Sequence, residues 1–271
     1  YKKTFDCPTA KNERFFIHFG AVNYIADVYF NGKKLGHHEG GFTPFQFEVT
    51  NLVKEKGNSL IVRANSARVK NGIPGSLFDW FNYGGITRDV LLIKTRQVFV
   101  GDYKIQLDPQ DEGRIKGYVK LDTALAGKVI TLSIPELRVN KKLVTDQKGN
   151  AAIDLKKDIR LWTPEEPKLY HVSLGVEGDT VSDRIGFRSI RVDGTKILLN
   201  GKPVFLRGVN IHEEIPQRRA RAWSESDAKM LIDWAKELGC NFVRLVHYPH
   251  NEYTIKYAEE KGIMVWEEGP V

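Results

Sequence analysis

Alternating hydrophobic and polar residues dominate the first hundred positions of the chain. Apolar side chains recur at every second position in short stretches, as they do in half-buried β-strands. One such stretch ends in Asn31-Gly32, a dipeptide typical of a tight hairpin turn. The pattern predicts strands at residues 15–21, 26–30, 45–49, 58–64 and 89–93. Short strands at this spacing indicate an all-β, jelly-roll-like sandwich over residues 1–98.

The next segment, residues 99–187, continues in the same style. Strands are predicted at residues 100–107, 114–121, 128–134 and 170–176. A Pro-rich connector at 162–167 precedes the last of them. We expect a second, smaller sandwich of immunoglobulin-like size here.

From residue 188 onward strands and helices alternate. Ser224 is a candidate helix N-cap, apolar residues then recur at helical spacing, and Gly239 is a candidate C-cap. A second helix is predicted at 253–261, and strands are predicted at 197–199, 203–209, 242–246 and 263–266. This alternation implies parallel pairing, so residues 188–271 are expected to form the first βα units of a truncated (β/α)₈ TIM barrel.

Polar and charged residues follow two of these buried strands directly. His212 comes after the run at 204–211, and His247 comes after the run at 242–246. Arg244 lies within the second run. Active sites of parallel barrels are built where the strands end, so these three residues are candidates for a functional site. The alternatives are histidines that bond to neighbouring backbone groups and an arginine that pairs with a nearby glutamate.

The composition narrows the class of protein only slightly. The net charge is +7, from 41 Lys and Arg against 34 Asp and Glu. Because the lysines are scattered, we interpret them as a solvated surface and expect no nucleic-acid partner. No apolar run approaches the roughly 18 residues of a membrane span. The two cysteines, Cys7 and Cys240, are expected to be free thiols.

Several long motifs resemble glycoside hydrolase family 2, which contains β-galactosidases, β-glucuronidases and β-mannosidases. In the first domain these are Ala-Asp-Val-Tyr-Phe-Asn-Gly at 26–32, the stretch 36–45, and Gly-Gly-Ile-Thr-Arg-Asp-Val at 84–90. In the third segment they are Asn-Gly-Lys-Pro at 200–203, Arg-Gly-Val-Asn-Ile-His-Glu at 207–213, Val-Arg-Leu-Val-His-Tyr-Pro at 243–249, and 260–268. Together they cover nearly the whole chain in the family's order.

The resemblance implies hydrolysis of terminal β-galactosides or β-glucuronides by a retaining double displacement. It also implies that His212 and His247 bind the sugar, together with Asp79, which belongs to a β-glucuronidase-like stretch at 79–86. Arg244, as a guanidinium at the strand end, is a candidate for orienting the ring hydroxyls or a carboxylate. The other interpretation of Asp79 is a turn-forming residue in a loop rich in Gly and Asn. One departure from the family is Arg-Arg-Ala-Arg at 218–221, where relatives carry a Gly-Arg-Ala-like stretch.

The catalytic pair of carboxylates is expected outside this sequence. In the family, the acid/base and nucleophile glutamates come from later barrel strands, past Val271. Glu267 and Glu268 are adjacent at a strand end, so their side chains should point to opposite faces and cannot flank one bond. One of them is expected to line the barrel mouth, and the alternative is a surface or hydrogen-bonding carboxylate. The polypeptide alone is therefore expected to be inactive.

The cofactor, the partners and the cellular compartment are the remaining properties to consider. No cofactor is expected, although some β-galactosidases of the family bind magnesium through residues matched past Val271. The partner is a carbohydrate substrate, no membrane contact is expected, and the sequence leaves homo-oligomers open. It also leaves open the sugar, the linkage and whether the protein is cytoplasmic or periplasmic. The rival hypothesis is a non-catalytic carbohydrate-binding protein, since two of three domains are sandwiches.

Overall fold

A computed structural model describes residues 1–9, 11–67, 70–75, 78 and 80–270. The chain divides into two compact units. The first comprises Tyr1–Lys94, Gly208–Ala258 and Met264–Val271, and the second comprises Thr95–Arg207 and Glu259–Ile263. The first sandwich and the barrel strands therefore share one unit. The domain limits expected after residues 98 and 187 stay predictions.

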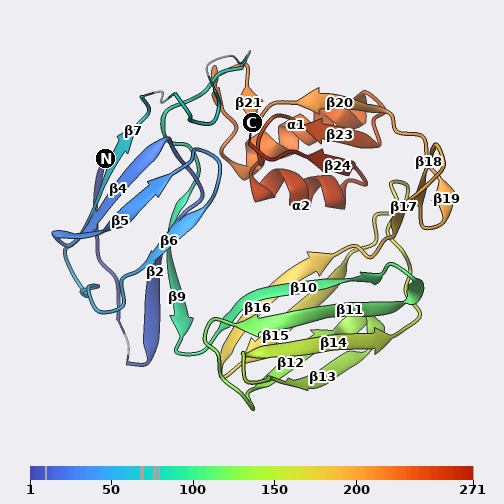
Figure 1. Ribbon diagram of the computed structural model, residues 1–271, viewed down its shortest axis with the longest axis horizontal. Helices are drawn as coiled ribbons and strands as arrows, with labels where there is room; N and C mark the ends of the chain where they lie inside the picture. The colour runs from blue at the N-terminus through green and yellow to red at the C-terminus, as the bar shows by residue number, and fades with distance from the viewer. Residues whose placement is uncertain (10, 68–69, 76–77, 79, 271) are drawn as a thin grey trace. The chain divides into compact units, whose positions relative to one another are not determined.

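The first unit begins with a sandwich of two antiparallel sheets (Figure 1). Buried and partly exposed residues alternate along Ile25–Phe30, as the sequence pattern predicts. Asn31 and Gly32 both have positive φ and close the hairpin behind this strand. One sheet has the order β1 (Lys2–Phe5), β7 (Asn58–Asn65), β4 (Ile25–Phe30), β5 (Lys33–Glu39), and the other has the order β6 (Phe45–Glu48), β2 (Glu13–Phe19), β9 (Val90–Arg96). A short pair, β3 (Val22–Asn23) and β8 (Gly85–Ile86), completes the sandwich.

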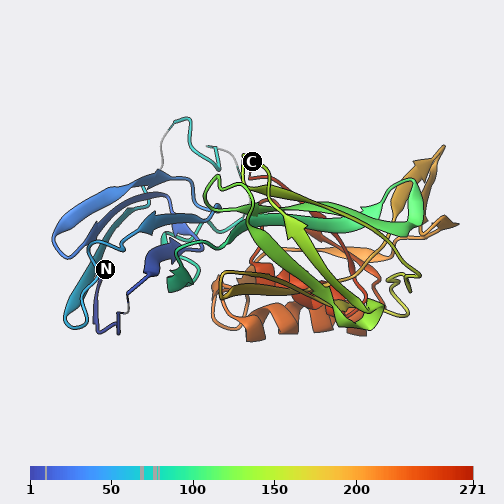
Figure 2. The ribbon, with the colours of Figure 1, turned by 90° about the horizontal axis from the view of Figure 1, so that it is seen from below.

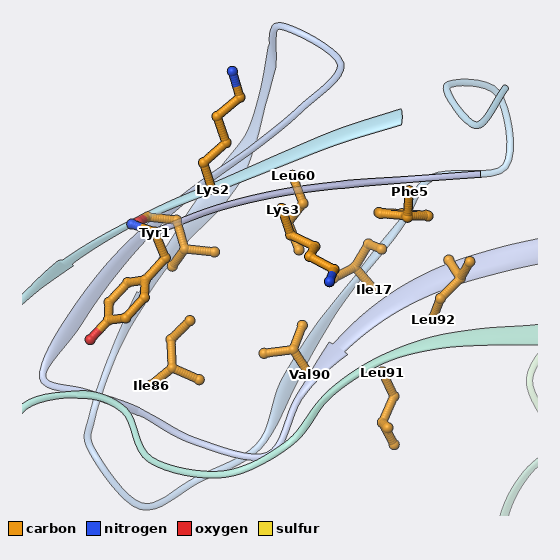
Figure 3. Close-up of a pocket in the computed structure, with 11 residues that line it drawn as sticks. Tyr1, Lys2, Lys3, Phe5, Ile17, Leu60, Ile86, Val90, Leu91 and Leu92 are labelled. Atoms are coloured by element: carbon orange, nitrogen blue, oxygen red, sulfur yellow. The ribbon is translucent and has the colours of Figure 1, made fainter. Parts of the chain in front are cut away.

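An apolar groove of about 490 Å³ opens along one side of this sandwich. Both sheets contribute to its lining, with Phe5 and Leu60 from one and Ile17, Val90 and Leu92 from the other (Figure 3). The groove continues the apolar core that fills the space between the sheets.

The second unit is built on another antiparallel sandwich with its own core. One sheet pairs β10 (Val100–Asp108), β11 (Asp111–Leu121) and β14 (Asn150–Lys156), and the other pairs β13 (Val139–Val144), β12 (Val129–Ile134), β15 (Tyr170–Val176) and β16 (Asp179–Ile185). A one-turn 3₁₀ helix, η1 (Pro135–Leu137), joins β12 to β13. Trp162 is fully buried, and its indole N–H donates to the carbonyl oxygen of Glu259 at 2.8 Å. Trp162 thus anchors the Pro-rich connector, of which Glu165 and Glu166 are exposed.

A small antiparallel sheet precedes the barrel strands. It consists of β17 (Ile190–Asp193), β18 (Lys196–Leu199) and β19 (Lys202–Pro203). The strand predicted over residues 203–209 is therefore misplaced. Lys202 and Pro203 pair backwards with Leu199 and Leu198 through the Asn200-Gly201 turn, and the barrel strand begins only at Gly208.

The barrel segment contains three parallel strands and two helices. The strands are β20 (Gly208–Ile211), β23 (Phe242–Leu245) and β24 (Met264–Glu267), paired in that order. The helices, α1 (Glu225–Glu237) and α2 (Glu252–Glu260), lie on one face of this sheet (Figure 2). A short hairpin of β21 (Glu214–Ile215) and β22 (Ala220–Arg221) follows β20. The observed elements confirm the predicted order of sandwich, sandwich and incipient barrel.

Helix α1 has a double cap at its N-terminus. The Ser224 hydroxyl accepts from the Asp227 backbone N–H, and the Asp227 carboxylate accepts from the Ser224 backbone N–H. Arg218 also donates to both carboxylate oxygens of Asp227, at 2.8 and 2.7 Å. This hydrogen bond from Arg218 is the main cause that lowers the pKa of Asp227 to about 2.

Asp227→Asn is expected to destabilise the protein by about 2 kcal/mol at neutral pH, because a charged cap and its arginine pair are lost. A depressed folded-state pKa gives stability above the ordinary Asp value of 3.8, and that stability is lost as pH falls toward about 2. The gap between parent and variant should therefore close in acid. Urea denaturation of both proteins across this pH range measures the gap, and a constant gap would contradict the assignment.

Candidate functional site

The carboxyl ends of the three parallel strands bring the predicted site residues together. Asn210, Arg244 and Trp266 lie at the same register across β20, β23 and β24. His212 follows β20, His247 lies two residues beyond β23, and Glu268 follows β24. Because the strands are parallel, these residues share one edge of the sheet.

A chain of contacts connects these side chains. Arg244 Nε donates to Glu268 Oε1 at 2.7 Å, and Arg244 Nη2 lies 2.5 Å from the same oxygen. The other oxygen, Oε2, lies 3.1 Å from His247 Nδ1. The His247 ring in turn meets the His212 ring edge-on, with centroids 5.5 Å apart. We call the set His212, His247, Glu268 and Arg244 the strand-end cluster.

The charge of Glu268 determines which ring nitrogen of His247 carries the hydrogen. Burial raises the pKa of Glu268, but the hydrogen bond and charge of Arg244, with a further contribution from His247, outweigh it and hold the pKa below its usual value. An ionised carboxylate only accepts, so Nδ1 of His247 carries the hydrogen. In the neutral ring, Nε2 then carries no hydrogen. This nitrogen can therefore accept a hydrogen bond from a hydroxyl group.

Three of the four predicted sugar-binding residues thus lie within one cluster: His212, Arg244 and His247. The fourth, Asp79, lies outside the described residues. The two adjacent glutamates diverge as the strand geometry predicts. Glu268 joins the strand-end cluster, whereas Glu267 accepts from the backbone N–H of His250 at 2.9 Å. The roles of all these residues in binding stay predictions.

A second cluster, absent from the sequence predictions, lies directly beside the first. Glu213 is 1% exposed, and its carboxylate accepts from Arg88 Nη2 at 3.0 and 3.3 Å. It also accepts from the Asn251 backbone N–H and lies 3.7 Å from Arg221 Nη1. Arg88 belongs to the first sandwich and also donates to the carbonyl oxygens of Phe42 and Pro249. We call Glu213, Arg88 and Arg221 the buried ion cluster.

Aromatic rings surround the Arg221 guanidinium. Its central carbon lies 4.6 Å from the Tyr248 ring centroid, 5.3 Å from Phe42 and 5.6 Å from Tyr83. Phe42 and Tyr248 stack on each other with centroids 4.4 Å apart. Burial raises the pKa of Tyr248 to about 12. Since Tyr248 follows His247 and Glu213 follows His212, the buried ion cluster holds the backbone of both candidate histidines.

Two arginines of the basic run at 218–221 form ion pairs within the protein. Arg218 pairs with Asp227 and Arg221 is buried in the ion cluster. Arg219, in turn, has a φ of 50° within the turn between β21 and β22. Arg218 and Arg219 are exposed, whereas Arg221 is buried.

No group of three or more His, Cys, Asp or Glu side chains among the described residues is placed to hold a metal ion. None of the helices formed by them is long and apolar enough to cross a membrane. Cys7 and Cys240 are both free and buried.

Three models of known protein families match successive parts of the chain. The glycosyl hydrolase 2 galactose-binding domain-like model matches residues 1–73, the glycosyl hydrolases family 2 model matches 98–188, and the family 2 TIM barrel domain model matches 190–271. The chain therefore belongs to glycoside hydrolase family 2.

Individual relatives agree with this assignment. A β-glucuronidase of Bacteroides fragilis is 33% identical over 97% of this chain, and a β-galactosidase of Thermoanaerobacter pseudethanolicus is 31% identical over 96%. The chain spans only 41% and 37% of their lengths. The crystal structure of an FMN-binding β-glucuronidase from Faecalibacterium prausnitzii superposes with a TM-score of 0.87 at 26% identity, covering all of this chain and 45% of that one.

Proposed function

We propose that the protein containing this chain hydrolyses terminal β-glycosides, either β-glucuronides or β-galactosides, and that the strand-end cluster binds the sugar. The observation that carries this proposal is the contact chain from His212 through His247 and Glu268 to Arg244. It lies where barrel enzymes place their active sites. The β-glucuronidases and β-galactosidases among the relatives support the substrate class.

Each member of the cluster has a distinct task in this proposal. His247 offers Nε2 to a sugar hydroxyl, and Glu268 holds its ring by the bond to Nδ1. His212 contacts the same ring and presents a second imidazole. Arg244 anchors Glu268 from the other side, so it acts through the carboxylate on the histidine. A sugar hydroxyl that gains charge during the reaction would be stabilised by such fixed groups.

The carboxylates of the two clusters are not free to act as the catalytic pair. Both oxygens of Glu268 are engaged, by Arg244 and by His247. Glu213 is buried between two arginines. A retaining glycosidase needs two carboxyl groups about 5–5.5 Å apart across the bond that breaks. We propose that this pair comes from residues beyond Val271, so the 271-residue chain contributes binding and positioning.

The purified 271-residue polypeptide is therefore expected to show no glycosidase activity, because the carboxylates proposed to protonate the leaving group and form the intermediate lie beyond Val271. The measurement is turnover of nitrophenyl β-glucuronide and nitrophenyl β-galactoside. Turnover within about a hundredfold of a full-length relative would place the catalytic groups inside this chain.

Asp79 is proposed as a further sugar contact in the full-length protein. Asp79→Ala is expected to lower catalytic efficiency by roughly ten- to a hundredfold, the worth of a hydrogen bond that a sugar hydroxyl donates to a carboxylate. Its melting temperature should change little. Steady-state kinetics beside a thermal melt separates the roles: unchanged kinetics with a large drop in melting temperature would make Asp79 a turn residue instead.

The substrate class is tested on the full-length protein. The first measurement compares the rates at which it hydrolyses nitrophenyl β-glucuronide, nitrophenyl β-galactoside and, as the control, nitrophenyl α-galactoside. The second uses proton NMR to identify which anomer of the sugar is released first. We expect one of the two β-glycosides to be hydrolysed with retention and the α-glycoside to be left intact. We also expect the activity not to depend on an organic cofactor. Comparing the activity before and after dialysis against EDTA tests whether it depends on magnesium. Binding of sugars without hydrolysis of any β-glycoside would favour a carbohydrate-binding protein.

A further inference from the structure

The first sandwich is closed along one side and open along the other. On the closed side, β5 ends one sheet, β6 ends the other, and these two strands contact each other. On the open side the last strands are β1 and β9, which belong to different sheets. Among the described residues, β1 pairs only with β7 and β9 pairs only with β2. Each of these two strands therefore has an edge that no described strand pairs with.

The apolar groove of about 490 Å³ lies between these two edges (Figure 3). Phe5 lines it from β1, and Val90 and Leu92 line it from β9. Ile17 and Val62 also line it, and both belong to the buried core between the sheets. The groove therefore opens directly onto the core of the sandwich.

Strand β9 carries apolar side chains that the sandwich leaves exposed. Leu91 is 49% exposed and Leu92 is 37% exposed, although their neighbour Val90 packs against the core. Contact of apolar side chains with water is unfavourable, and an unpaired strand edge beside them is a place where another strand can add. Edge, side chains and groove together fit an added β-strand, as in recognition by β-augmentation.

The shape and charge of the groove define the strand that fits. β9 is seven residues long, so a segment of similar length covers its edge. Because side chains alternate between the faces of a sheet, such a strand needs apolar residues at every second position to fill the groove. Lys2 and Lys3 line the groove from β1, so an acidic residue in the added strand complements their charge.

The size of the relatives indicates where the strand comes from. The chain spans 41% of the Bacteroides fragilis β-glucuronidase and 37% of the Thermoanaerobacter pseudethanolicus β-galactosidase. A protein of either length has more than half of its residues outside the 271 described by this sequence. A segment of the same molecule has a high effective concentration at the groove, which favours it over a separate partner or a second copy.

We propose that a β-strand from the part of the full-length protein outside residues 1–271 fills the apolar groove. The strand pairs with the unpaired edge of β9, buries alternate apolar side chains against Val90 and Leu92, and sets an acidic residue beside Lys2 or Lys3. The proposal shares with the proposed function only the premise of a longer protein. A full-length protein that hydrolyses β-glycosides while its groove stays open would overturn this proposal and leave the proposed function intact.

Cysteine labelling of the full-length protein tests whether the groove is covered. Leu92→Cys places a thiol in the groove, at a position that is 37% exposed in this structure. Ile61→Cys is the matched control, because Ile61 is 41% exposed and points to the opposite face of β7 from Leu60 and Val62, which line the groove. The native cysteines are both buried.

We expect a maleimide to modify the Leu92→Cys variant at least about 100-fold more slowly than the Ile61→Cys variant, because a covered thiol reacts only when the strand opens locally. Equal rates in the two variants would show that the groove is open, and the proposal would be overturned.

A cross-linking measurement on the unaltered full-length protein identifies the strand. A carbodiimide joins a lysine to a carboxylate in direct contact, and mass spectrometry locates the joined peptides. Lys34, which lies 2.7 Å from Asp27, is the internal control. We expect Lys2 or Lys3 to be joined to an Asp or Glu outside residues 1–271 of the same molecule.

Two results of the cross-linking would contradict the proposal. If Lys2 and Lys3 were joined only to residues 1–271 of a second copy, as mixed ¹⁵N-labelled and unlabelled protein would reveal, the groove would be an interface between copies. If neither lysine were joined to any carboxylate while Lys34 was joined to Asp27, no acidic strand would lie in the groove.

Discussion

Replacing Glu213 by glutamine is expected to destabilise the first unit by about 3–5 kcal/mol, because it leaves two buried guanidinium groups without a countercharge. Glu213 is the shared partner of Arg88 and Arg221, whose side chains are 8% and 4% exposed. Burial raises the pKa of Glu213, and the two arginines oppose that rise. The carboxylate also bonds the Asn251 backbone, so the loop after β23 should loosen with it.

Urea denaturation followed by far-UV circular dichroism measures this loss. The control is Glu252→Gln, which removes an exposed carboxylate paired with Lys256 at 3.5 Å along α2. That change should cost less than about 0.5 kcal/mol. If both variants unfolded at the same urea concentration as the parent, the buried ion cluster would have no role in holding the sandwich to the barrel strands.

Substituting Arg244 by methionine is expected to lower the catalytic efficiency of the full-length protein by about 10²- to 10³-fold, the usual effect of removing one fixed group that stabilises developing charge. Arg244 and His247 hold opposite oxygens of Glu268. Without Arg244 the carboxylate can turn, and the His247 ring loses its fixed orientation. Since the interaction matters most as charge develops, kcat should fall more than KM rises.

Steady-state kinetics on the better nitrophenyl glycoside provides the measurement. Arg191→Met is the matched control, because Arg191 is exposed on β17. Arg244→Met should keep the parent's melting temperature within a few degrees, since its side chain is one-third exposed. If the activity fell only in proportion to the amount of folded protein, Arg244 would have a structural role and no role in catalysis.

Local sequence patterns predicted most elements of this fold. The alternation at 26–30 and the helix after Ser224 follow from side-chain periodicity and capping, which act over a few residues. The strand expected over 203–209 failed for a non-local reason. Pro203 is taken up by a hairpin with Leu198, so residues 204–207 form a connection. Phe205 is accordingly 76% exposed although it lies in an apolar run.

The candidate site was predictable only in part. His212 and His247 are recognisable because each follows an apolar run that forms a strand, and parallel strands bring their ends together. The partners of Glu213 are not recognisable in this way, because Arg88 lies 125 residues away in another domain type. Such an ion cluster arises from the packing of a sandwich against barrel loops, and no local pattern encodes it.

The most direct test of the proposed function is a crystal structure of the full-length protein with the lactam analogue of whichever sugar it releases. Analogues of this kind resemble the transition state and bind tightly. We predict that the analogue lies at the ends of β20, β23 and β24, with ring hydroxyls in hydrogen-bond contact with His212 and His247 and with Glu268 still held by Arg244. An analogue bound without contact to either histidine would contradict the assignment of the strand-end cluster as the sugar-binding site.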